Sequence, residues 1–116
     1  MTPPPGSKRE HDRVDVAIRT VYRDEINADA SDTLMSNLSL GGCFVATDKP
    51  SAVGTRVDLR FRLEDGAEPI AARGIVRWIK EGDGGGMGIQ FEAVKGKDLL
   101  VLKRFIEQRL VDGIFG

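Results

Sequence analysis

The sequence predicts a mainly β protein, a small six-stranded antiparallel barrel followed by a C-terminal α-helix. The first observation is that apolar and polar residues alternate in several short runs between residues 14 and 91, with turn-forming residues between the runs. The second is a change of period near residue 98, after which apolar residues recur every three or four positions. Many short strands with regular turns, followed by one amphipathic helix, favour a barrel that the helix caps or flanks.

Alternation of apolar and polar residues sets the expected strands. In residues 56–63 four apolar side chains are expected to point inward, and the arginines between them outward. In the later run, Ile70, Ala72, Val76 and Trp78 fall on one face, so we expect Trp78 in the core or at the barrel rim. Strands are expected at residues 14–22, 43–47, 56–63, 70–79 and 87–91, with a further extended segment at 33–36.

The helix is expected to run from Leu99 to Gly113, with Asp98 as its N-cap. Its apolar residues lie at helical spacing and are expected to close the core. A partner surface is the alternative if Ile114 and Phe115 extend this stripe. The stripe consists of Leu99, Leu102, Phe105, Ile106 and Leu110.

Length and composition favour one domain without a catalytic or metal site. The chain has 116 residues and a formal net charge of −1, which provides no global basic field for DNA, RNA or a membrane surface. His11 and Cys43 are the only histidine and cysteine, so neither a metal site nor an internal disulfide is expected. Residues 1–7 are expected to form a flexible tail before a domain at 8–113. They lack the apolar region of a secretory signal, and no apolar run is long enough for membrane insertion, so we expect a cytoplasmic protein.

The most informative stretch is Ser36–Val45, which reads Ser-Asn-Leu-Ser-Leu-Gly-Gly-Cys-Phe-Val. A carboxamide at Asn37, a hydroxyl at Ser39 and a glycine pair interrupt a run that otherwise has strand character. Asn37 and Ser39 have the same strand parity, so both side chains could face one ligand, and Gly42 permits a positive φ or a close backbone approach. The alternative is a polar turn in which both side chains bond to their own backbone.

Two arginines four residues apart, Arg9 and Arg13, precede the first strand. The same spacing recurs at three other places, but within a strand such residues stand roughly 13 Å apart, too far to hold one small ligand together. The segment from Lys8 to Arg13 has no strand alternation and can fold back, so only there can both guanidinium groups converge. A guanidinium binds phosphate or the edge of guanine through two hydrogen bonds. The alternative is a solvated charged segment.

Together, Arg-x-x-x-Arg and Asn-x-Ser-x-x-Gly resemble the two signatures of the PilZ domain, a bacterial receptor for cyclic di-GMP. The resemblance continues in order through the later strands and the closing helix, over roughly residues 8–110. It implies a PilZ-type barrel that binds cyclic di-GMP in second-messenger signalling, of the kind linked to motility and biofilm formation. The implied ligand-binding residues are Arg9, Arg13, Asn37, Ser39 and Gly42, with Lys8 and Gly41 as further candidates.

Further expectations follow from this resemblance. The protein is expected to be a receptor without catalysis and without a cofactor, which passes its signal to an effector protein as a monomer or weak homodimer. Cyclic di-GMP is expected to order the Lys8–Arg13 segment against the barrel and so change a partner-binding surface. A cation at Lys8 could favour a second, stacked dinucleotide. The competing interpretation is a PilZ-like structural adaptor in motility or pilus assembly that does not bind nucleotide.

Overall fold

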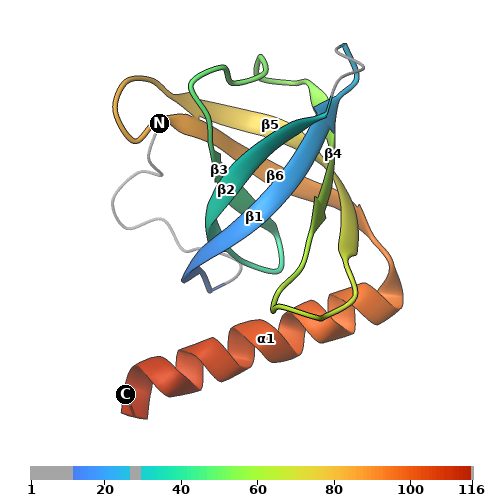
Figure 1. Cartoon of the computed structure of the whole chain (residues 1–116), viewed down its shortest axis with the longest axis vertical. Helices are drawn as coiled ribbons and strands as arrows, with labels where there is room; N and C mark the ends of the chain where they lie inside the picture. The colour runs from blue at the N-terminus through green and yellow to red at the C-terminus, as the bar shows by residue number, and fades with distance from the viewer. Residues whose placement is uncertain (1–11, 27–29, 116) are drawn as a thin grey trace.

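Six antiparallel strands close into a barrel, and one helix lies across an end of it (Figure 1). The computed structural model describes residues 12–26 and 30–115. Around the ring the strands follow the order β1-β2-β3-β6-β5-β4. The elements are β1 (Val14–Asp24), β2 (Ser31–Leu38), β3 (Gly42–Ala46), β4 (Arg56–Phe61), β5 (Ile70–Lys80), β6 (Gly86–Val94) and α1 (Gly96–Phe115).

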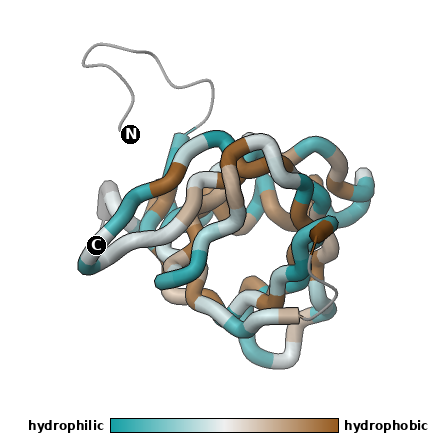
Figure 2. Tube along the Cα trace, turned by 90° about the horizontal axis from the view of Figure 1, so that it is seen from above, coloured by the Kyte–Doolittle hydropathy of each residue, from teal (hydrophilic) through white to brown (hydrophobic). Residues whose placement is uncertain are grey.

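The predicted fold class is confirmed, and each strand lies close to its expected range. Viewed from above, the chain trace closes into a ring (Figure 2). Alternation places one face of every strand inside, as β4 shows most simply: Val57, Leu59 and Phe61 are buried while the residues between them are exposed. The packed interior makes the barrel a rigid scaffold, and functional chemistry must therefore take place on its outer face.

The helix closes one end of the barrel with fewer residues than the sequence predicted. Leu102 and Ile106 are buried in the core, and Phe105 and Leu110 pack partly against it. Leu99, however, is 41% exposed, so its expected place in the buried stripe is wrong. The N-cap prediction is also wrong, because the helix starts at Gly96 and Asp98 lies in its first turn. There its carboxylate still favours the positive end of the helix dipole.

Candidate functional site

A β-bulge in β2 turns Asn37 to the outside of the barrel. Met35 pairs with Val45 on β3 and is fully buried, whereas the next register pair is Asn37 with Phe44. Two residues of β2 therefore advance against one of β3, and this extra residue reverses the inside-outside alternation. Leu38 consequently points into the core and Asn37 points outward. Without the bulge, the parity of β2 would have buried Asn37 beside Met35.

Strand register connects Asn37 to a row of residues across the outer face. Asp15 of β1 pairs with Asn37, Asn37 pairs with Phe44, Phe44 with Gly88 of β6, and Gly88 with Trp78 of β5. Directly paired residues of antiparallel strands point to the same face. One band therefore carries a carboxylate and a carboxamide at one end and two aromatic rings at the other. We call these five residues the outer-face row.

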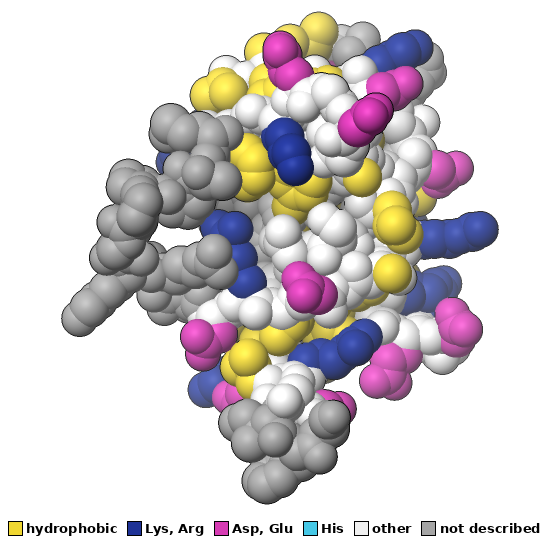
Figure 3. All heavy atoms as spheres, turned by 90° about the vertical axis from the view of Figure 1, so that its left-hand side faces the viewer, with side chains coloured by type: hydrophobic (Ala, Val, Ile, Leu, Met, Phe, Trp, Pro, Cys, Tyr) yellow, Lys and Arg dark blue, Asp and Glu magenta, His cyan; other side chains and the backbone are white. Residues whose placement is uncertain are grey.

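Asn37 has a half-buried side chain with unused hydrogen-bonding capacity. Within the part of the chain that the structure describes, its carboxamide makes no hydrogen bond. Arg13 stands immediately before β1, and Val14 pairs with Leu38 beside Asn37. Arg13, the last residue of the Lys8–Arg13 segment, therefore lies at the start of β1 close to the Asn37 carboxamide. Figure 3 views the molecule from the side on which β2 and β3 lie in Figure 1, and hydrophobic side chains there lie close to lysine and arginine side chains.

Ser39 holds the turn that joins β2 to β3. Its hydroxyl oxygen accepts hydrogen bonds from the N–H groups of Gly41 and Gly42, each at 3.1 Å, and it donates to the Gly42 carbonyl at 3.3 Å. The Ser39 backbone N–H donates to the same carbonyl at 2.8 Å. Ser39 is only 6% exposed and lies beyond the end of β2. Its hydroxyl therefore fixes the backbone beside Asn37, as in the polar-turn alternative.

Gly42 is required by the close approach of two strands. A Cβ atom there would lie 2.1 Å from the carbonyl oxygen of Ile89 on β6. Gly42 is absent from the glycines with positive φ, so of the two reasons anticipated for glycine only the close approach applies. The Gly41 carbonyl accepts a hydrogen bond from the Phe91 N–H at 2.8 Å, which ties the same turn to β6.

Trp78 does not lie in the core, the first of the two places predicted for it; it is half-buried and stands near the end of β5. A β-bulge between Val76 and Trp78 reverses the alternation in β5, so that Trp78 faces outward opposite Gly88. Its indole stacks on Phe44, with ring centroids 5.1 Å apart and an interplanar angle of 24°. A Cβ atom on Gly88 would lie 2.1 Å from the Trp78 Nε1 atom, so the ring needs a residue without a side chain beneath it. Sequence reasoning missed this aromatic pair, and the alternating glycines at 86 and 88 are the signal that could have revealed it.

The described residues offer neither a reactive thiol nor a metal site. Burial raises the pKa of the Cys43 thiol, because desolvation disfavours the thiolate. Among the described residues no group of histidine, cysteine, aspartate or glutamate side chains could hold a metal ion. None of the described helices is long and apolar enough to cross a membrane.

The predicted site residues separate into the four at the β2–β3 turn, Arg13 beside them, and two that precede the described residues. Asn37, Ser39, Gly41 and Gly42 lie together at the end of β2 and the start of β3, and Arg13 stands beside them at the start of β1. Of these side chains, Asn37 and Arg13 are available to a ligand, whereas Ser39 is used within the turn. Lys8 and Arg9 lie outside the described residues.

A closed six-stranded antiparallel barrel with a helix at one end is the architecture of this chain. Similar solved structures share it. The Bacillus subtilis inhibitor of motility, MotI/DgrA, aligns with a TM-score of 0.79 and 21% identity over 95% of this chain, which spans 56% of that protein. The PilZ domain of YcgR from Escherichia coli, solved with cyclic di-GMP, aligns with a TM-score of 0.71 and 16% identity over 92% of this chain and 95% of that one.

The family is established by the sequence itself. The model of the PilZ domain matches residues 7–108, and the chain therefore belongs to the PilZ family. A further relative in structure, Borreliella burgdorferi PlzA in complex with cyclic di-GMP, has a TM-score of 0.60 and 16% identity over 84% of this chain and 40% of that protein. No curated protein sequence matches the chain. At these identities the structural neighbours establish the fold alone.

Proposed function

We infer that this protein is a cyclic di-GMP receptor that binds the dinucleotide on the outer-face row and has no catalytic activity of its own. The observation that carries the inference is the PilZ match over residues 7–108. The Asn37 carboxamide supports it, because it makes no hydrogen bond within the described residues and lies on the outer face beside Arg13. Cyclic di-GMP carries two phosphates and two guanines, which suit guanidinium forks and a carboxamide. The neighbours solved with this dinucleotide support the same choice of ligand.

The ligand-binding residues have different parts in this proposal. Arg9 and Arg13 bind phosphate or the guanine edge, and Asn37 supplies a donor and an acceptor from the barrel. Ser39 acts as a positioning residue, because its hydroxyl holds the N–H groups of Gly41 and Gly42 in the turn. Lys8 adds a cation beside Arg9. We further expect the ligand to hold the Lys8–Arg13 segment against the barrel and so change the surface offered to a partner.

Titration calorimetry with cyclic di-GMP tests the proposal. We expect Arg13→Ala to weaken binding by about tenfold or more, since one bidentate contact contributes roughly 1–3 kcal/mol. Arg9→Ala should have an effect of similar size. Arg19→Ala is the matched control, because it removes an exposed arginine of β1 that lies outside the outer-face row. The proposal is wrong if the parent protein does not bind, or if the control weakens binding as much as the two test variants.

A second candidate function is a PilZ-like adaptor that assembles with other proteins without binding nucleotide. The observation that favours it is the Ser39 hydroxyl, whose bonds within the turn account for its place in the motif without a ligand. The same titration separates the two functions. Hydrolysis of cyclic di-GMP by the purified protein would instead point to an enzyme.

A further inference from the structure

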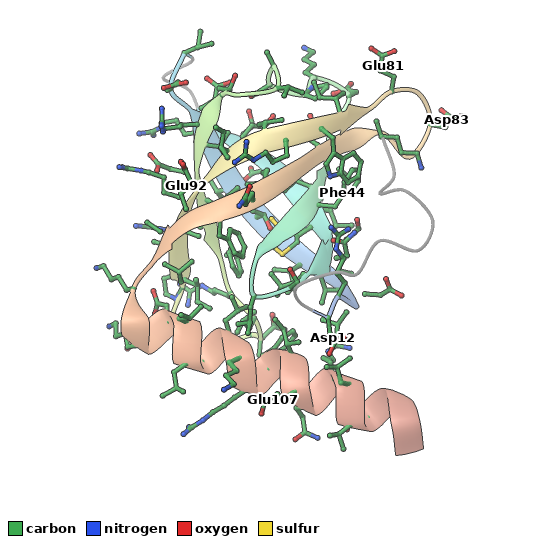
Figure 4. The ribbon with its side chains drawn as sticks, turned by 180° about the vertical axis from the view of Figure 1, so that it is seen from behind. Asp12, Phe44, Glu81, Asp83, Glu92 and Glu107 are labelled. Atoms are coloured by element: carbon green, nitrogen blue, oxygen red, sulfur yellow. The ribbon has the colours of Figure 1, made fainter. Side chains whose placement is uncertain are left out.

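A shallow groove crosses the side of the barrel that lies opposite β3. In the closed strand order, β4 is three strands from β3 in either direction, and the groove is centred on β4. Its volume is about 770 Å³, within the range of small ligand and peptide sites. In Figure 4, Glu92, which forms an ion pair with Arg56 at the start of β4, lies on the left of the view, and Phe44 of the outer-face row lies to the right.

Small apolar residues form the floor of the groove and arginines border it. Register aligns Val21 of β1 with Arg60 of β4, and Arg60 with Ala71 of β5. Val21 is 39% exposed, and Ala71 is exposed beside it. The adjoining row consists of Arg23, Asp58, Arg73 and Ala93.

The groove carries an excess of positive charge that the chain as a whole lacks. Arg73 is paired with Asp58, with 3.0 Å between Nε and Oδ1. Arg23 and Arg60 make no ion pair or hydrogen bond within the described part of the chain, and Lys95 at the end of the groove is likewise free there. A molecule with a net charge of −1 thus places around one apolar strip three cations that have no ion pair within the described residues.

The groove continues into a second hollow, which makes it long enough for an extended segment. The second hollow has a volume of about 560 Å³ and shares Val21 and Arg60 with the first. It ends near Leu63 and Pro69 beyond β4. A partner cannot bind by adding a strand, because the barrel is closed and offers no free edge. Recognition must therefore use the outward side chains of the groove.

We propose that this groove is a docking surface for an acidic segment of a partner protein, in which carboxylates flank an apolar side chain. The carboxylates pair with Arg23 and Arg60, and the apolar side chain packs on Val21 and Ala71. Nucleic acid fits less well, because Asp58 in the groove and Glu64 and Asp65 in the second hollow interrupt the positive surface. The inference goes beyond the proposed function and does not depend on it, since none of these residues lies in the outer-face row.

Fluorescence anisotropy with a labelled peptide of repeated Glu-Glu-Leu tests this proposal on the full chain. We expect the peptide to bind, and Arg60→Glu and Arg23→Glu each to lower its affinity by about fivefold or more, since reversal replaces an attraction with a repulsion. Arg104→Glu on α1 is the matched control, because it makes the same charge change at an exposed position that does not line the groove. Amide resonances of Ala71 and Ala93 should shift on addition of the peptide to the parent protein.

Three outcomes would overturn the proposal: no binding of the peptide, equal loss in the Arg104→Glu control, or tighter binding of duplex DNA than of the peptide at the groove arginines. A Lys-Lys-Leu peptide should not bind. Circular dichroism verifies the fold of each variant. If one of the two arginine variants does not fold, the other still tests the proposal. Cyclic di-GMP titration of Arg60→Glu should match the parent protein, so failure of the ligand proposal and failure of this one are distinguishable.

Discussion

Replacing Gly42 with alanine is expected to destabilise the barrel strongly, whether or not a ligand is present. The new Cβ atom would lie 2.1 Å from the Ile89 carbonyl oxygen, whereas real Cβ atoms essentially never approach closer than 3.0 Å. The obstacle is backbone, which cannot rotate away, so β3 and β6 must separate by nearly 1 Å at this end. Loss of two or three hydrogen bonds at about 1 kcal/mol each, with some strain, lowers the free energy of unfolding by about 2–4 kcal/mol.

Gly88→Ala is the informative comparison, because its Cβ atom would also lie 2.1 Å from its nearest neighbour. That neighbour is the Trp78 side chain, which can swing outward and lose only its stacking on Phe44. We expect a cost of about 1–2 kcal/mol. Gly113→Ala, with nothing within 4 Å of its Cβ, should leave stability unchanged or slightly raised.

Urea unfolding followed by far-ultraviolet circular dichroism measures all three variants on one scale. The expected order of destabilisation is Gly42→Ala first, Gly88→Ala second and Gly113→Ala last. If Gly42→Ala unfolds within about 0.5 kcal/mol of the parent protein, the close-approach argument is wrong. If Gly42→Ala and Gly88→Ala lower the free energy of unfolding equally, a backbone obstacle is no more costly here than a side-chain obstacle.

Three further predictions concern the core and the outer-face row. Leu102→Ala removes a fully buried side chain of α1 and should cost about 2–4 kcal/mol in the same urea assay; a loss below 1 kcal/mol would mean that the helix does not close the core. Cys43 should resist iodoacetamide at pH 8 in the native protein, because burial raises the thiol pKa and the thiolate is scarce. The thiol should react once urea unfolds the chain. If mass spectrometry shows rapid labelling of the native protein, this expectation is wrong. Asp15→Asn should tighten cyclic di-GMP binding by about two- to threefold at low salt, since it removes a negative charge opposite Asn37; calorimetry that shows weaker binding would instead make Asp15 a partner of the guanine edge.

Sequence patterns predicted the fold where side-chain alternation is uninterrupted. In β4 the strict alternation of Val57, Leu59 and Phe61 with arginines and aspartate fixes the inner face, and the structure confirms it. The period change near residue 98 likewise located α1 to within a few residues. Burial of apolar area acts locally in both cases, so the local sequence contains the information.

Alternation misleads where one strand has an extra residue relative to its neighbour. A bulge in β5 places Trp78 on the outer face, although counting by twos from Val76 puts it in the core. A bulge in β2 likewise lets Asn37 face outward, as its place in the motif predicted, although counting by twos from Met35 would bury it. A bulge depends on the register with the adjacent strand, which a single strand's sequence does not contain. The hydroxyl of Ser39 raises the same difficulty, because its bonds to Gly41 and Gly42 depend on how the turn closes.

The closed barrel also constrains how a ligand signal can reach a partner. Asp15 in the outer-face row and Arg23 at the groove lie on one strand, roughly 26 Å apart along β1, with a filled core between the two faces. Because a packed core does not deform gradually, we expect the groove to bind its peptide with the same affinity, within about twofold, with or without saturating cyclic di-GMP. Anisotropy titrations in both conditions measure this coupling. The groove would then supply a constant attachment, and the ligand-dependent contact would come from the face around Asn37; a tenfold change in peptide affinity would instead show that the barrel itself has two states.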